Sequence, residues 1–317
     1  MSPEVVACPA HLQRTALECL FGDWVPNLRH DQVAFLLDTA RDGGLDNLLA
    51  VVSDGQLAGA VLGRPLGGHA ALVWPPRLTT GKTIERIGGD RIEAGRTIDQ
   101  LLCSALLTQL LQRLRTAGAV LVQALLTPGA ANDEALLSNA GFSLLADLDY
   151  MVGFNRLAPD DSSPLVFEAY APRSHTRFKQ LVERTYEGSL DCPALDGLRD
   201  VDDVLAGYRV TGRFDPRHWL LAHVEGVDLG CLVLADDPRL DQWELIYMGL
   251  VPEARGRRWG RLLVAHAQRL SARAGRKRMM LSVDRANAPA VRTYTHLGFV
   301  RCDERRVMFR TLADRKN

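Results

Sequence analysis

A turn rich in arginine and glycine in the second half of the chain has the composition of an anion-binding site. It joins a predicted strand to a predicted helix and reads Arg255-Gly256-Arg257-Arg258-Trp259-Gly260-Arg261. The start of a helix has unsatisfied N–H groups and the positive end of the helix dipole, so it can hold a phosphate. Glycine lets the backbone approach the anion, and flanking arginines add charge-assisted hydrogen bonds. The turn therefore predicts a phosphate site, and a basic surface turn that caps the helix is the alternative.

The elements that would position this turn alternate between strands and helices. The hydrophobic periodicity predicts strands at 165–171, 219–235 (a hairpin), 242–251, 278–283 and 305–310, and helices near 174–186, 201–211, 260–274 and 288–296. We therefore expect an α/β fold in which helices flank a mixed central sheet.

The same pattern occurs twice along the chain. The matching positions are Gly55, Gly59, Gly118, Gly141 and Met151 in the first copy and Gly226, Gly230, Gly275, Gly298 and Met308 in the second. A series of matches in register indicates an internal repeat, and the polar segment 157–164 between the copies has the composition of a linker. We predict two tandem domains of this α/β type, at 1–158 and 164–317.

The composition is that of an ordinary soluble protein. Of the 317 residues, 47% are hydrophobic and 24% are charged, and the longest apolar runs are too short to cross a bilayer. The N-terminus has no secretion signal, and the six cysteines are scattered without metal-ligand spacing. We therefore expect a cytoplasmic protein with no membrane partner, no disulfide framework and no metal site.

The net charge of zero hides an excess of arginine and lysine from Glu253 onward. Such a basic segment indicates a polyanionic partner, either a nucleic acid or a phosphorylated cofactor, unless the arginines solvate an outer helix face. The sequence lacks the interleaved aromatic residues of single-strand binders, so nucleic acid ranks last among these partners.

Two motifs in the second half together resemble those of the GNAT acetyltransferase superfamily. The pyrophosphate loop of that family, Q/R-x-x-G-x-G/A, is matched by Arg255 and Gly260, with Arg258 in place of the inner glycine. The later family motif, N-x-x-A-x-x-x-Y-x-x-x-G-F, is matched throughout by Asn287, Ala290, Tyr294, Gly298 and Phe299. A tandem chain of this length with an active second half also resembles the mycothiol synthases, one group within a broad set of tandem acetyltransferases.

The resemblance implies that an amine attacks the thioester of acetyl-CoA directly, which makes acetyl-CoA a co-substrate bound at the arginine-glycine turn. Tyr294 then stands where the family commonly has the general acid. Glu244 stands where the family has a base, or a carboxylate that acts through water. Strand backbone around Leu250 and Val251 would pair with the pantetheine arm, and Asn287 would fix the loop before the last helix and contact the cofactor.

Each of these side chains also has a structural interpretation. Tyr294 could be a packing residue, and Glu244 could be a solvent-facing strand carboxylate. Alternation along the strand predicts that Trp243, Leu245 and Tyr247 share the face opposite Glu244.

The first copy follows the same order of elements without these chemical groups. Its counterpart of the pyrophosphate loop, at 98–104, has no glycine and no arginine, and Leu137 stands at the position of Tyr294. We expect a degenerate domain that supports structure or substrate binding, with catalysis in the second domain.

The acceptor is left open between small-molecule amines and protein N-termini. The segment 187–205 is rich in acidic residues and lies where the resemblance places a wall of the acceptor site, so a cationic acceptor and a solvated helix face are both compatible with it. A second hypothesis is a catalytically silent acyl-CoA-binding or interaction module, which Arg258 favours. A homodimer is compatible with the sequence.

Overall fold

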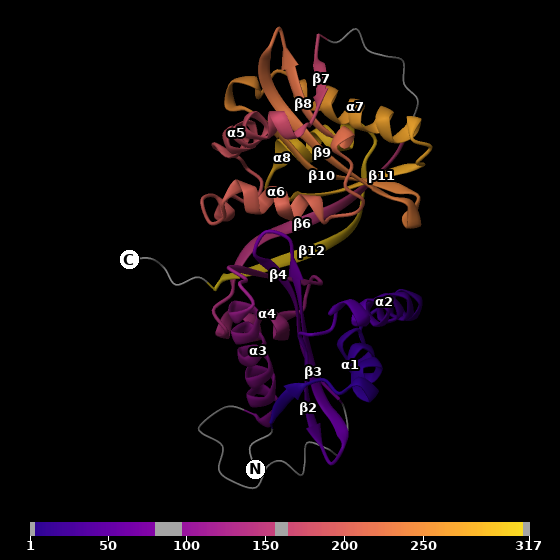
Figure 1. Ribbon diagram of the computed structural model, residues 1–317, viewed down its shortest axis with the longest axis vertical. Coiled ribbons are helices and arrows are strands. Elements are labelled where there is room, and N and C mark those ends of the chain that lie inside the picture. Colours follow the sequence, from indigo (N-terminus) through magenta and orange to yellow (C-terminus); the bar gives the residue numbers. More distant parts are fainter. Residues whose placement is uncertain (1–3, 80–96, 156–163, 313–317) are drawn as a thin grey trace. The chain divides into compact units, whose positions relative to one another are not determined.

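Strands and helices alternate through both halves of the computed structural model, which describes residues 4–79, 97–155 and 164–312 (Figure 1). The chain divides into two compact units, Met1–Leu144 with Met308–Asn317, and Leu145–Val307. Each unit has a mixed sheet flanked by helices, so the predicted α/β class is confirmed.

The first unit has the strand order β1-β2-β3-β4-β5, in which β4 and β5 pair in parallel and the others pair antiparallel. Its strands are β1 (Val5–Ala7), β2 (Leu48–Ser53), β3 (Gln56–Leu66), β4 (Ala70–Leu78) and β5 (Leu121–Leu126), and its helices are α1 (Gln13–Leu20), α2 (Pro26–Asp38), α3 (Ile98–Thr116) and α4 (Ala131–Asn139). Helix α3 buries leucines spaced four residues apart, from Leu102 to Leu114, against one face of the sheet. Helices α1 and α2 pack against the other face.

The second unit has the strand order β12-β6-β11-β10-β9-β8-β7, and the end of β12 from Met308 onward belongs to the first unit. These strands are β6 (Ser143–Phe154), β7 (Val166–Ala169), β8 (Trp219–Val224), β9 (Val227–Asp237), β10 (Gln242–Leu250), β11 (Arg278–Asp284) and β12 (Val300–Thr311). Helices α5 (His175–Tyr186) and α6 (Val201–Arg209) pack on one face, and α7 (Trp259–Arg273) and α8 (Ala288–His296) on the other. Among the described residues, no helix is both long and apolar enough to cross a membrane.

The compact units and the two sequence copies are divided at different places. Strand β6 comes from the first copy, yet it pairs antiparallel with β11 of the second unit, from Arg278 with Phe154 to Asp284 with Leu148. Met151 of β6 is buried in the core of the second unit, and its counterpart Met308 is buried in the core of the first. The ends of the two copies are thus exchanged between the units. Almost all of the predicted linker at 157–164 lies outside the described residues.

This exchange predicts how isolated pieces of the chain should behave. A fragment of residues 164–317 lacks β6, which lies between β11 and β12 in the sheet of the second unit, so two strand edges would lose their partner. We expect this fragment to show no cooperative thermal unfolding by circular dichroism, whereas a matched fragment of residues 143–317 should unfold cooperatively. Equal cooperative transitions for both fragments would contradict the exchange.

Strand β10 contains the irregularity that shapes the second unit. Its parallel pairing with β11 ends at Leu245 with Leu281, while its antiparallel pairing with β9 continues to Leu250. A register shift between Leu245 and Tyr247 marks a β-bulge, and the strand turns over there. The predicted alternation is wrong past this point, because Tyr247 packs toward α5 and α6 while Leu245 is buried on the α7 and α8 face.

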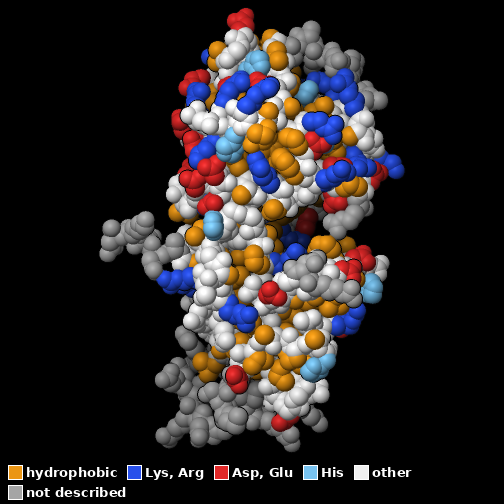
Figure 2. Space-filling model, viewed as in Figure 1, with side chains coloured by type: hydrophobic (Ala, Val, Ile, Leu, Met, Phe, Trp, Pro, Cys, Tyr) orange, Lys and Arg blue, Asp and Glu red, His pale blue; other side chains and the backbone are white. Residues whose placement is uncertain are grey.

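The basic excess of the C-terminal segment is distributed over ion pairs within the second unit. Three of these pairs are Arg276 with Asp236, Arg285 with Asp149, and Arg306 with Asp147. Figure 2 shows that basic and acidic side chains both occur on the face of the second unit in view. The acidic partners come from earlier parts of the chain, which explains how a strongly basic segment fits a protein of zero net charge.

Candidate functional site

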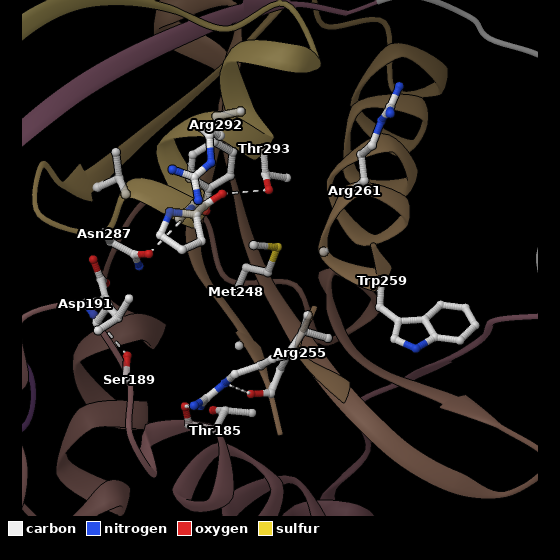
Figure 3. Close-up of a pocket in the computed structure, with 18 of the residues that line it drawn as sticks. Thr185, Ser189, Asp191, Met248, Arg255, Trp259, Arg261, Asn287, Arg292 and Thr293 are labelled. Atoms are coloured by element: carbon white, nitrogen blue, oxygen red, sulfur yellow. Dashed lines mark hydrogen bonds between the residues drawn. The ribbon is translucent and has the colours of Figure 1, made fainter. Parts of the chain in front are cut away.

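A pocket of about 770 Å³ opens in the second unit where β10 and β11 stop pairing (Figure 3). The loop after α5, the second half of β10, the turn before α7 and the first turns of α8 supply its walls. The pocket brings together most of the predicted site residues, namely Leu250, Arg255, Gly256, Arg258, Trp259, Gly260, Arg261, Asn287 and Tyr294. The open edge of β10 runs along the pocket and can offer N–H and C=O groups to an extended ligand.

One end of the pocket has the geometry of an anion site. Helix α7 begins with Arg258 as its N-cap, and Arg258 and Arg261 are exposed there. Gly256 and Arg258 have φ values of 75° and 65°, which fold the turn so that the start of the helix faces the pocket. The helix dipole and two arginines would thus favour a pyrophosphate at this end.

Arg255 has a structural task in addition to its predicted one. Its guanidinium donates to the backbone oxygens of Leu250, Gly188 and Thr185 at 3.1, 3.0 and 3.0 Å. These bonds tie the end of β10 to the end of α5 and to the loop that follows. Arg255 therefore fixes two walls of the pocket relative to each other, and its contact with a phosphate stays a prediction.

Tyr294 lines the pocket from helix α8. Its side chain is 6% exposed, lines the pocket and packs edge-on against Phe299, with the ring centroids 5.8 Å apart. Burial raises the pKa of Tyr294 far above its ordinary value, and the nearby Asp191 adds to this shift. The phenol thus remains protonated at neutral pH, as a proton donor must.

Three predicted site residues are not among the residues that line the pocket, namely Glu244, Val251 and Arg257. Glu244 is half-buried on β10, and burial together with the charge of Asp237 raises the pKa of its carboxyl. Val251 is 2% exposed and belongs to the core under α5, whereas Arg257 is exposed in the turn. Asn287 lines the pocket and also caps α8, because its Oδ1 accepts a hydrogen bond from the Ala290 N–H at 3.3 Å.

A pocket carboxylate that no sequence motif indicates is Asp191, in the loop after α5. Its Oδ1 accepts a hydrogen bond from the Asp284 N–H at 3.1 Å, and its own N–H donates to Ser189 Oγ at 3.1 Å. Asp191 is exposed, yet the protein atoms near its carboxyl raise its pKa, and the hydrogen bond from the Asp284 N–H opposes this shift. The acidic composition of 187–205 was the one signal that pointed to this loop.

The first unit has a different arrangement at the corresponding place. Arg77 near the end of β4 forms a two-bonded ion pair with Asp133 in the first turn of α4, with both N···O distances at 2.7 Å. The counterparts of these two elements in the second unit, β10 and α8, flank the pocket. In the first unit an internal ion pair joins them, which agrees with the degenerate loop at 98–104.

Arg258 occupies a backbone conformation that favours glycine, and this predicts a measurable strain. A non-glycine residue in the left-handed region costs about 1–2 kcal/mol. We expect Arg258→Gly to raise the stability of the second unit by about 1 kcal/mol, part of the gain being offset by the greater chain entropy of glycine when unfolded. Thermal unfolding measures this, with Arg257→Gly as the control. Arg257 is outside the left-handed region, so its replacement should give no gain, and equal shifts for both variants would contradict the strain.

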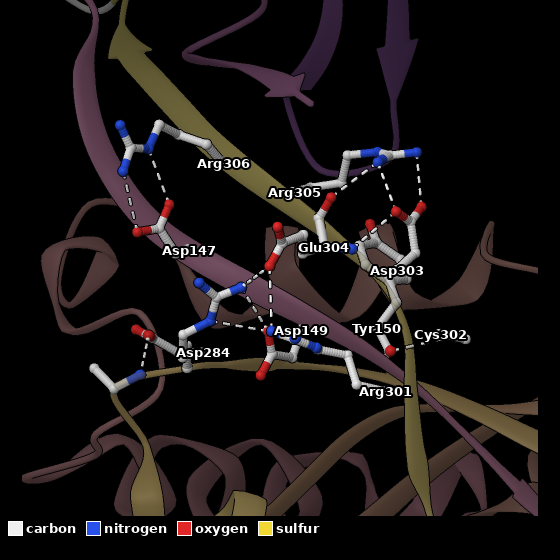
Figure 4. Close-up of polar contacts among 12 residues, drawn as sticks. Asp147, Asp149, Tyr150, Asp284, Arg301, Cys302, Asp303, Glu304, Arg305 and Arg306 are labelled. Atoms are coloured by element: carbon white, nitrogen blue, oxygen red, sulfur yellow. Dashed lines mark hydrogen bonds and ion pairs between the residues drawn. The ribbon is translucent and has the colours of Figure 1, made fainter. Parts of the chain in front are cut away.

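A second polar cluster, on β6 and β12, lies apart from the pocket lining (Figure 4). Arg285 bonds to Asp149 and Glu304, and Arg306 pairs with Asp147. Arg301 is a further partner of Asp149 and Glu304, and Arg305 pairs with Asp303, so four arginines face four carboxylates. The ion pairs link β6 to β12 and to Arg285, which follows β11, so we interpret the cluster as structural.

Comparison with known proteins agrees with this geometry. Residues 182–299 match the model of the Acetyltransferase (GNAT) family. A GCN5-related N-acetyltransferase from Sphaerobacter thermophilus has a similar structure, with a TM-score of 0.63 and 16% identity over 99% of this chain and 98% of that one. A glucosamine N-acetyltransferase region of a fungal multi-domain GH3 β-N-acetylglucosaminidase gives a TM-score of 0.62 and 12% identity over 98% of this chain and 38% of that one. A search of curated proteins gave no significant match.

A third solved structure has the tandem arrangement itself. The tandem GNAT protein from the clavulanic acid biosynthesis pathway gives a TM-score of 0.50 and 15% identity over 98% of this chain and 99% of that one. The segment that matches the family model runs from α5 to just past α8 and so contains the elements that form the pocket. The match to the GNAT family model thus falls within the second unit, and the fold of the whole chain resembles that of a tandem GNAT protein.

Proposed function

We propose that the second unit transfers an acetyl group from acetyl-CoA to a primary amine. The observation that carries this proposal is one pocket that joins an anion-binding helix start to a protonated phenol along an open strand edge. Acetyl-CoA has matching parts, because an extended pantetheine arm separates its pyrophosphate from its thioester. The strand edge suits the amide groups of that arm.

The reaction requires attack on the thioester, a proton donor for the leaving thiolate and an acceptor for the proton of the amine. The amine nitrogen attacks the thioester carbonyl, a C–N bond forms, the C–S bond breaks, and the electron pair leaves on sulfur. Tyr294 gives its proton to the leaving thiolate, a step that typically contributes about 10²- to 10⁴-fold in rate. Glu244 takes up the proton that the attacking nitrogen loses, and because Glu244 does not line the pocket, this proton passes through a bridging water.

The proposal extends to the acceptor, the compartment and the oligomeric state. The acceptor is a small-molecule amine or a protein N-terminus, the protein works in the cytoplasm, and a homodimer is compatible with this activity. The resemblance to the mycothiol synthases stays a prediction and brings no substrate with it. The second candidate is a silent acyl-CoA-binding or interaction module, favoured by Arg258 at the position of the inner glycine.

A coupled assay separates the two candidates. Thiol release from acetyl-CoA is followed with a chromogenic disulfide reagent over a panel of primary amines, and the products are weighed by mass spectrometry. The transferase should release thiol only when protein and amine are both present, and the amine should gain one acetyl group. Acetyl-CoA binding without turnover on any amine would instead support the silent module.

A further inference from the structure

Asp191 is the one acidic side chain among the residues that line the pocket, and the transfer chemistry gives it no role. Figure 3 shows it beside Asn287, on the opposite side of the pocket from Trp259 and Arg261. Its charge also acts on Tyr294, so it belongs to the reacting end of the pocket and not to the pyrophosphate end.

The described residues provide no cation for this carboxylate. Among them Asp191 forms no ion pair, and its bond to the Asp284 N–H comes from the backbone. The guanidinium of Arg255 is held by three carbonyl oxygens, and Arg292 is an exposed pocket residue on α8 without an ion pair to Asp191. Asp191 is exposed and lines the pocket, so a cation that enters the pocket can pair with its carboxylate directly.

A second carboxylate increases the negative potential at this place. Asp284 is 5% exposed and accepts hydrogen bonds from the N–H groups of Cys192 and Ala286. Two backbone donors satisfy it, but its charge still faces the Asp191 loop. The site therefore attracts a cation more strongly than a single surface aspartate would.

The loop holds Asp191 in place before any ligand arrives. The Asp191 N–H donates to Ser189 Oγ. The guanidinium of Arg255 donates to the backbone oxygen of Gly188, the residue before Ser189. Cys192, the residue after Asp191, has a φ of 47°, a left-handed conformation that the bond from its N–H to Asp284 helps to hold. A carboxylate fixed in this way is preorganised for binding.

The Tyr294 phenol is an independent sign of a ligand at this end. It is 94% buried, it lines the pocket, and within the described part of the chain no hydrogen-bond partner for it occurs. The hydroxyl is therefore available to a polar group of a ligand in the pocket, because a phenol can both donate and accept a hydrogen bond. The donor set does not suit a metal, since no group of three or more His, Cys, Asp or Glu among the described residues could hold one.

We propose that Asp191 binds the ammonium group of the acceptor beside Tyr294 and thereby selects acceptors that carry a positive charge. This inference rests on the proposed transfer from acetyl-CoA. A neutral acceptor of the same shape, such as an alcohol, would leave the carboxylate without its cation and would bind more weakly.

The test measures acceptor binding to the full-length chain saturated with CoA, which holds the cofactor site without reaction. The probes are tyramine, spermidine and trialanine, with tyrosol as the neutral match of tyramine. Asp191→Asn keeps an acceptor for the Asp284 N–H and removes the charge, while Glu187→Gln removes a charge from the same loop outside the pocket lining. Calorimetry gives the affinity of each probe and of CoA.

At least one amine should bind the wild-type complex, and tyrosol should bind far more weakly. Asp191→Asn should weaken binding of that amine by about 30-fold, because the ammonium group loses its charged partner in the pocket. The affinity for CoA, and the amine affinity of the Glu187→Gln variant, should stay at the wild-type level. Unchanged amine affinity in Asp191→Asn, or no amine binding to a wild-type complex that binds CoA, would overturn the inference.

Further outcomes distinguish a failure of this inference from misfolding and from a failure of the proposed function. If Asp191→Asn loses CoA binding through misfolding, Asp191→Ser gives a second variant that also retains an acceptor for the Asp284 N–H, and the same 30-fold criterion applies to it. If wild-type protein does not bind CoA at all, the proposed function fails and the inference fails with it. If wild type acetylates an amine and Asp191→Asn keeps the same KM for it, the inference alone fails.

Discussion

Replacing Tyr294 by phenylalanine is expected to lower kcat for acetyl transfer by about 100-fold and to leave KM for acetyl-CoA nearly unchanged. The variant loses the proton donor for the leaving thiolate. Its ring can still pack edge-on against Phe299, so the core under α8 should remain intact. Steady-state thiol release at saturating amine measures kcat, and titration of acetyl-CoA measures KM.

The control for this prediction is Tyr208→Phe. Tyr208 is a partly buried tyrosine of the second unit, its hydroxyl lies 3.3 Å from that of Tyr186, and it does not line the pocket. This variant also loses a phenol hydroxyl and should keep kcat close to the wild-type value. An unchanged kcat in Tyr294→Phe would leave Tyr294 as a packing residue and would remove the general acid from the mechanism.

Gly260→Asp should weaken acetyl-CoA binding by about 100-fold, equivalent to about 3 kcal/mol. The new carboxylate would stand in the first turn of α7, where the pyrophosphate is expected, and like charges repel strongly in a partly enclosed site. The fold should tolerate the change, since an added Cβ would be 3.7 Å from Leu250 Cδ1 and 3.9 Å from Met248 Cε. An acidic residue at a helix start is also favourable for the helix itself.

Gly260→Asn separates charge from size in this prediction. Asparagine has the shape of aspartate without its charge, so it should weaken acetyl-CoA binding much less than aspartate does. Calorimetry on both variants at low salt gives the comparison. Equal affinities for wild type and Gly260→Asp would mean that the pyrophosphate lies elsewhere than at the start of α7.

Local patterns in the sequence predict the elements of the second unit closely. The helices expected at 260–274 and 288–296 are Trp259–Arg273 and Ala288–His296, and the strand expected at 278–283 is Arg278–Asp284. The exchange of β6 has no such signal, because hydrophobic alternation defines a strand without naming its partner. The one-residue bulge in β10 is equally invisible, and it reverses the face on which Tyr247 lies.

Some residues of the candidate site can likewise be predicted from local sequence, and others cannot. The arginine-glycine turn and Tyr294 could be found from the sequence because each belongs to a contiguous motif, and the structure places both in one pocket. Asp191 could not be found, because its position depends on bonds to Asp284 and on the clamp that Arg255 makes from another part of the chain. Glu244 was expected at the pocket from its strand, but the lining of the pocket begins at the next residue, Leu245.

Calorimetric titration of the full-length chain with acetyl-CoA tests most directly whether the pocket of the second unit is an acyl-CoA site. One site per chain is expected, because the second unit has an open pocket and the Arg77–Asp133 pair joins the corresponding elements of the first. Arg77→Ala should leave that single site unchanged. Two sites per chain, or no binding at about millimolar acetyl-CoA, where a site of about −4 kcal/mol would be half filled, would contradict this account.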